Sequence, residues 1–216
     1  MSRLRKWFFN QPPHTPPYVF EDMERVQPRR LLRTFGIDWM ASQSAWVAPI
    51  WMLAVGIVIG LIAESHAAAG KRLLLGLAYG ALILASILVH YVGGAVAGWL
   101  VRAPMRRVVF TATLAYNVYD ESPDYPSRVH VIRSLGEPAA NLILGAVTLG
   151  LYVAGNHSHP VLFLAVLNLA FFVIAMAPFP TMHCGVLLKN LRAWSLVELQ
   201  DLNEARPYPV IWEKGR

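Results

Sequence analysis

The stretch from Leu73 to Val101 reads LLLGLAYGALILASILVHYVGGAVAGWLV, and it decides the fold class. It contains no Asp, Glu, Lys or Arg, while Arg72 precedes it and Arg102 follows it. A helix needs about 20 apolar residues to cross the hydrocarbon of a bilayer. The stretch therefore predicts a membrane-spanning helix that is long enough to tilt or to emerge at one face.

The composition of the whole chain agrees with a membrane protein. Hydrophobic residues make up 56% of the 216 residues and charged residues only 15%, a balance far from that of an ordinary soluble domain. The net charge of +6 comes from basic residues beside apolar runs, not from a basic stripe with stacking aromatic residues, so no nucleic-acid partner is expected. The single cysteine, Cys184, excludes an internal disulfide and a Cys-rich zinc site.

Three further apolar runs bring the predicted number of spans to four. No cleavable signal peptide is expected, because the first run begins only near Ser44. Leucines alternate with charged residues in the segment 185–202, which predicts an amphipathic surface helix. The predicted spans are 44–63, 73–101, 135–154 and 160–177.

Residues 106–119 have a period-two apolar pattern rich in β-branched and aromatic residues, which predicts a small cytoplasmic β-strand or hairpin. The expected fold is thus an all-α polytopic membrane protein with one small β element. Its expected parts are a cytoplasmic N-terminal arm (1–42), a membrane domain (43–202) and a cytoplasmic tail (203–216).

Basic residues predict the orientation of the chain, because Lys and Arg concentrate in cytoplasmic segments. All of the 19 Lys and Arg residues except Lys71 and Arg72 lie before the first span, between the second and third spans, or after the fourth. Both termini are therefore expected in the cytoplasm, with the spans surrounded by lipid in the cell (inner) membrane.

Polar residues interrupt the apolar runs at three places, and a polar side chain inside a span usually has a partner. The first is His90, deep in the second span. The second is the sequence Gly-Glu-Pro-Ala-Ala-Asn from Gly136 to Asn141, at the start of the third span. The third is the sequence from Pro178 to Gly185, after the fourth span.

The order of these elements resembles the site-2 protease family of membrane metallopeptidases. In that family a helix with H-E-x-x-H is followed by a cytoplasmic strand region, a helix opened by G-P-x-x-N, and a helix that ends in a proline-rich turn and D-G-G. The resemblance covers about Leu73 to Trp194 and implies a three-helix core. The positions that match are His90, Gly93, Pro138, Asn141, Pro178, Pro180 and Gly185.

The catalytic positions depart from the family pattern. Tyr91 stands where the family has the catalytic glutamate, Gly94 where it has the second zinc-binding histidine, and His183 where it has the aspartate ligand. Tyrosine, with an ordinary pKa of about 10, is a poor base at neutral pH, and glycine offers no ligand. The resemblance therefore implies a vestigial site in which the family's hydrolytic mechanism is lost.

Alternative roles stay open for the remaining polar residues. No cofactor is expected: both histidines are expected to be hydrogen-bonded residues that fill the former zinc site. The alternative is that His90 and His183, with Cys184 or Glu137, hold a zinc ion. Glu137 is expected in the first turn of a helix, where a carboxylate complements the helix dipole.

Pro138 and Asn141 are expected to belong, with Glu137, to the same binding region, in which Asn141 satisfies backbone groups of the bundle. His157 and His159 are expected to form a turn rather than a ligand set.

Two functions remain. The first is a non-proteolytic, site-2-protease-like subunit that binds or assembles with other integral membrane proteins. The alternative is an active intramembrane zinc metallopeptidase with an altered ligand set.

Overall fold

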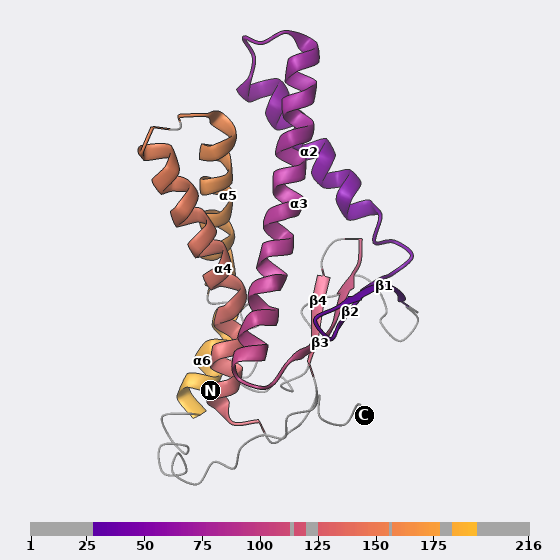
Figure 1. Cartoon of the computed structure of the whole chain (residues 1–216), viewed down its shortest axis with the longest axis vertical. Coiled ribbons are helices and arrows are strands. Elements are labelled where there is room, and N and C mark those ends of the chain that lie inside the picture. Colours follow the sequence, from indigo (N-terminus) through magenta and orange to yellow (C-terminus); the bar gives the residue numbers. More distant parts are fainter. Residues whose placement is uncertain (1–27, 113–114, 120–124, 156, 178–182, 194–216) are drawn as a thin grey trace, which may run out of the picture.

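A computed structural model of the chain describes residues 28–112, 115–119, 125–155, 157–177 and 183–193. Four long helices form two hairpins, α2 with α3 and α4 with α5, and a small sheet lies beside the lower part of α3 (Figure 1). The helices are α2 (Val47–Ala63), α3 (Ala69–Leu100), α4 (Ser127–Val153), α5 (His159–Ala175) and the short α6 (His183–Ala193), and the strands are β1 (Arg29–Thr34), β2 (Ile37–Ala41), β3 (Met105–Phe110) and β4 (Ala115–Tyr119).

Among the described residues, α3 and α4 are long and apolar enough to cross a membrane. α2 and α5 are also apolar but have 17 residues each. At about 1.5 Å per residue, such a helix spans about 26 Å, against a hydrocarbon thickness of about 30 Å. The mostly helical, membrane-protein character that the sequence predicted is therefore present, whereas the count of four spans stays a prediction.

Glycines let α2 and α3 approach closely. A Cβ atom added at Gly80 would lie 2.8 Å from the Cα of Leu53, and one added at Gly76 would lie 2.6 Å from the Cα of Ile57. No side chain fits at either position without moving the backbone of the other helix. This close approach is the geometry that small residues permit between helices in membranes.

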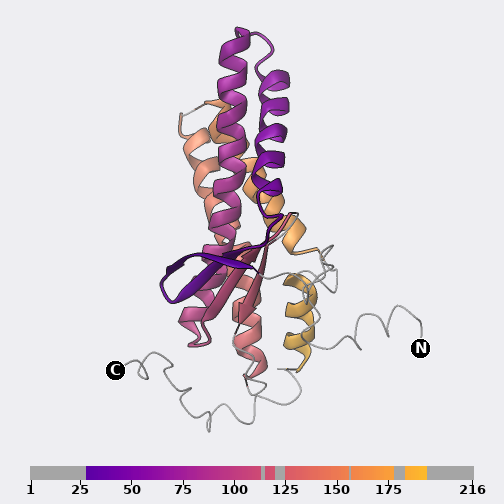
Figure 2. The same cartoon turned by 90° about the vertical axis from the view of Figure 1, so that its right-hand side faces the viewer.

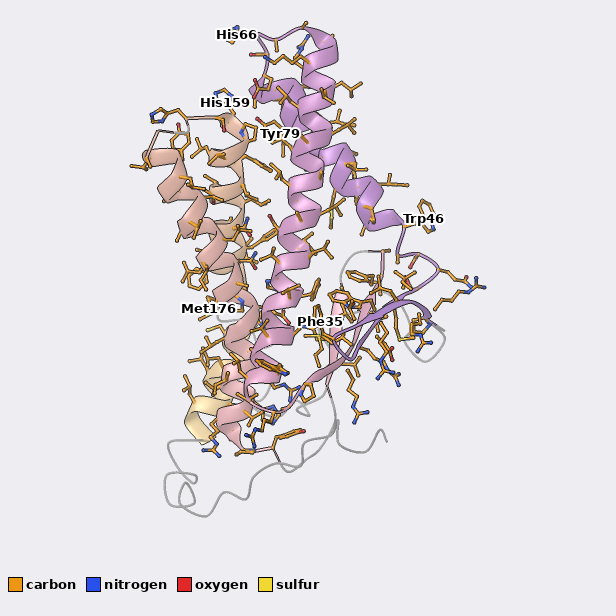
Figure 3. All side chains as sticks on the ribbon, viewed as in Figure 1. Phe35, Trp46, His66, Tyr79, His159 and Met176 are labelled. Carbon is orange, nitrogen blue, oxygen red and sulfur yellow. The ribbon has the colours of Figure 1, made fainter. Side chains whose placement is uncertain are left out.

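The two hairpins are tied together at the end opposite the sheet. Glu64, just after α2, accepts hydrogen bonds from the Tyr79 hydroxyl of α3 (2.9 Å) and from Nδ1 of His159 at the start of α5 (3.0 Å). Tyr79 and His159 lie at the same end of the bundle in Figure 3. The bond from Tyr79, and then that from His159, hold the pKa of Glu64 below its usual range. His159 is thus the first residue of α5 and also links the two hairpins through Glu64.

The sheet has the strand order β1-β2-β3-β4. β1 pairs with β2 and β3 with β4 in antiparallel fashion, while β2 and β3 are parallel and are connected through the α2–α3 hairpin. Phe35 and Gly36 both have positive φ (51° and 79°), as the two central residues of a type I′ hairpin turn require. Figure 2 shows the β1–β2 hairpin projecting to one side of the helices.

A small apolar core joins the sheet to α3. It consists of Ile37 of β2, Met105 and Val108 of β3, and Tyr91 of α3. Tyr91 also donates its hydroxyl hydrogen to the carbonyl oxygen of Ala115 at 3.0 Å. The sheet is therefore held at the level of His90 on α3.

The structure adds to the sequence prediction in two places. The strand or hairpin predicted over 106–119 is confirmed as β3 and β4, but residues 29–41, which were assigned to an arm, form β1 and β2 of the same sheet. α4 begins at Ser127, before the apolar run that opens near Leu135. The predicted arm before residue 28 and the part of the amphipathic helix after residue 193 lie outside the described residues.

Candidate metal centre

Three side chains from three helices converge at one point. His90 of α3 and His183, the first residue of α6, each place Nε2 at 3.0 Å from the same carboxylate oxygen, Oε2 of Glu137 in α4. One ligand atom from each of the three lies within 4.8 Å of the other two. The centroids of the two imidazole rings are 5.3 Å apart. The sequence-based expectation that His90 and His183 meet is confirmed.

Glu137 is the central residue of this cluster, and it is only 2% exposed. Its second oxygen, Oε1, accepts a hydrogen bond from the side-chain amide of Asn117 in β4. Asn117 of the sheet thus binds one carboxylate oxygen of Glu137, and the other oxygen faces the two histidines. The prediction that Glu137 lies in the first turn of its helix, where it would complement the dipole, is wrong, because α4 starts ten residues earlier, at Ser127.

Gly94 makes room for the carboxylate. A Cβ atom at this position would lie 2.8 Å from Cγ of Glu137 and 3.0 Å from its Cδ. Any larger side chain here would compete with Glu137 for the same space. Gly94 stands at the position of the family's second histidine and offers no ligand. Glu137 of the facing helix α4 places its carboxylate in that space instead.

Asn141 holds the far side of His90. Its Oδ1 lies 2.5 Å from Nδ1 of His90, and its Nδ2 donates to Oδ1 of Asn168 in α5 at 2.7 Å and makes a longer bond, 3.4 Å, to the carbonyl of Ser86. Asn141 thus hydrogen-bonds mainly to side chains, whereas the sequence predicts bonds to backbone groups of the bundle. It lies one helical turn after Glu137, so both reach the same histidine.

Tyr91 points away from the cluster. Its hydroxyl is bonded to the sheet and its ring belongs to the apolar core beneath it. Pro138 is fully buried next to Glu137 inside α4. The third member of the cluster is Glu137 and not Cys184, which the sequence left as an equal choice.

The three residues fit a zinc ion. Two histidines and one glutamate form the ligand set of a group of catalytic zinc sites. With metal–ligand distances of about 2.0–2.1 Å, neighbouring ligand atoms in a tetrahedron lie about 3.3 Å apart, close to the 3.0 Å measured from each histidine to Glu137. Asn141 and Asn117 supply the outer hydrogen bonds that orient zinc ligands.

Comparisons with known proteins support the fold. The chain is similar to the site-2 protease from Methanocaldococcus jannaschii, with a TM-score of 0.53 and 18% sequence identity over 81% of this chain and 76% of that one. Neither a protein-family model nor a curated protein matches the sequence. At this identity the likeness defines the class as a site-2-protease-like fold, and the chemistry must come from the residues present.

Proposed function

We propose that this chain is a zinc-binding membrane protein with a site-2-protease-like fold, that it has lost the family's peptidase mechanism, and that it binds extended segments of other membrane proteins. The observation that carries the proposal is the contrast between His90 and its neighbour Tyr91. His90 lies in a complete set of three ligand-type side chains, whereas the hydroxyl of Tyr91 is bonded to Ala115 and turned toward the sheet.

The ligand set is rearranged rather than lost. The family holds zinc with two histidines and an aspartate; here His90 keeps its position, His183 stands at the aspartate position, and Glu137 fills the space above Gly94. Two imidazoles and one carboxylate are retained, so the set keeps its ligand types and its charge. When bound, zinc acts as a Lewis acid and lowers the pKa of a bound water.

A base for that water is missing from the described part of the chain. Glu137 is the acidic member of the cluster, and both of its oxygens have partners: Asn117 on one, the two histidines on the other. In the family the base is a glutamate next to the first histidine, and here Tyr91 holds that position. The site therefore favours binding of a metal over hydrolysis of a peptide.

The open edge of the sheet supports a binding role. β4 is an edge strand, and an edge strand has unpaired backbone groups that accept an extended chain. Asn117 of this strand bonds to Glu137, so a peptide added there would run beside the metal cluster. The family resemblance points to membrane-protein segments as the occupants.

Zinc content and peptide cleavage test the proposal together. We expect the full-length protein in mild detergent to hold about one zinc per chain, and His90→Ala, His183→Ala and Glu137→Ala each to lose it. A buried polar change outside the cluster, Thr148→Val, is the matched control, because Thr148 bonds only to carbonyls of its own helix. A zinc-free wild-type protein would contradict the metal site.

Cleavage of a membrane-protein substrate that disappears in His90→Ala would instead establish the alternative, an active metallopeptidase with an altered ligand set. The binding role has its own readout. A photo-crosslinking residue at Val118 in β4 is expected to capture a partner polypeptide, whereas the same residue at Leu31 in β1, the opposite edge, is not. Equal capture at both edges would argue against binding at β4.

A further inference from the structure

A buried chain of polar side chains leads from α5 to the metal cluster. Ser86 of α3, Asn141 of α4 and Asn168 of α5 are all fully buried among apolar residues. Buried polar groups in a membrane protein are costly, so they usually serve a purpose. Asn168 lies outside the proposed ligand set and matches no position of the family pattern.

The direction of every hydrogen bond in this chain is fixed by backbone carbonyls. Asn168 bonds to the carbonyl oxygen of Leu164 at 2.8 Å, and a carbonyl only accepts, so the atom facing it must be the amide nitrogen. The Ser86 hydroxyl donates to the carbonyl of Leu82 at 2.8 Å, which leaves its oxygen free to accept from Asn168 at 2.9 Å. A flipped Asn168 amide would set oxygen against the Leu164 oxygen.

Both amide hydrogens of Asn168 are thereby used, and its Oδ1 faces Asn141. Asn141 must present its own amide nitrogen there, at 2.7 Å. Its Oδ1 is left to face Nδ1 of His90 at 2.5 Å. Since this oxygen only accepts, His90 must carry a hydrogen on Nδ1.

We propose, on the basis of the metal site above, that Asn168 is a positioning residue that acts through Asn141 to hold a hydrogen on Nδ1 of His90. Nε2 is then the ring nitrogen left for zinc. Without the metal it lies 3.0 Å from a carboxylate oxygen of Glu137, so the same rule gives it a hydrogen as well, and zinc would take the place of that hydrogen while Nδ1 keeps its own. Asn168 acts from a different helix, without touching a ligand.

The hydrogen on Nδ1 is the first test, and it needs no metal. In zinc-free full-length protein, the ring nitrogens of His90 are observed by 15N NMR at a pH above the ordinary pKa of imidazole, so that only hydrogens held by the surroundings remain. The His90 signals are those missing from a His90→Gln sample. We expect Nδ1 to carry a hydrogen in the wild type, with or without one on Nε2, and to lose it in part in Asn168→Leu, where Asn141 can turn its amide nitrogen toward the ring. An Nδ1 without a hydrogen in the wild type would overturn the proposal, even if no Asn168 variant folds.

Zinc affinity, measured by competition with a chelator, is the second test. We expect Asn141→Leu to bind zinc roughly 10- to 100-fold more weakly and Asn168→Leu roughly tenfold more weakly, with Thr148→Val unchanged. The double variant should bind no more weakly than Asn141→Leu, because Asn168 acts through Asn141. Wild-type affinity in a folded Asn168→Leu protein would overturn the relay. A wild-type protein that binds no zinc but has a hydrogen on Nδ1 would refute the metal site and support the relay.

Discussion

At the scale of single residues, Gly94 decides which side chain completes the cluster around His90. In α3, His90 supplies an imidazole, and Gly94, one turn later, has no side chain. The carboxylate of Glu137 in α4 occupies the space beside Gly94. A glycine in a helix normally weakens it by about 1 kcal/mol relative to alanine. At this position the loss of helix propensity is offset by room for a ligand-type group.

The substitution Gly94→Ala tests this role. Its Cβ would lie 2.8 Å from Cγ of Glu137, so we expect a loss of about 1–3 kcal/mol of stability from overpacking and weaker zinc binding. Thermal unfolding in detergent and chelator competition measure the two effects. The control is Gly150→Ala in α4, where a Cβ meets no atom within 4 Å. Wild-type zinc affinity in Gly94→Ala would show that Glu137 does not depend on this space.

At the scale of secondary-structure elements, the α2–α3 hairpin relies on glycines of α3 that face the backbone of α2. Gly80 and Gly76 of α3 both pack on the backbone of α2, around Leu53 and Ile57. These contacts fix the position of α2 against α3, and α2 in turn connects to β2 of the sheet. The placement of the sheet beside His90 thus depends partly on helix packing farther along the bundle.

We expect Gly80→Ala to destabilise the folded protein by about 1–3 kcal/mol, because its Cβ would lie 2.8 Å from the Cα of Leu53 and only a shift of α2 relieves the clash. Gly70→Ala, in the first turn of the same helix, meets no atom within 4 Å and should be neutral or slightly stabilising. Unfolding curves in detergent compare the two. An equal stability for both variants would mean that α2 moves away at no cost.

At the scale of the whole molecule, the two ends of the bundle differ in chemistry. One end has the sheet and the cluster of His90, Glu137 and His183, and the other has the contact of Glu64 with Tyr79 and His159. In Figure 3, His66 and His159 both lie toward that second end. The distribution of basic residues predicts that the end with the cluster faces the cytoplasm.

Cysteine labelling in intact cells tests this orientation. In a Cys184→Ser background, a cysteine at His66 or His157 is expected to react with a membrane-impermeant reagent, whereas one at Arg106 or Arg128 should react only after the membrane is permeabilised. The reason is the preference of Lys and Arg for cytoplasmic segments. Labelling of residue 128 from outside would reverse the topology and place the cluster around His90 at the opposite face.

The membrane-protein class and much of the helical pattern could be predicted from the sequence. The length of an apolar run and the position of basic residues are local properties, so they predict helices before any contact is known. The pairing of His90 with His183 could also be predicted, because the order of motifs from His90 to Gly185 resembles a known family. The alternating pattern of 106–119 predicted β3 and β4 for the same local reason.

The rest of the site depends on contacts between residues that are far apart in the sequence. Glu137 reaches His90 because α4 begins at Ser127 and because position 94 has no side chain, two facts that belong to different helices. β2 pairs with β3 across the whole α2–α3 hairpin and β1 pairs with β2, which the basic sequence of β1 does not indicate. Asn168 lies 27 residues from Asn141 and meets it only because α4 and α5 pack together. Contacts between distant residues depend on how helices approach, and no local pattern in the sequence encodes that.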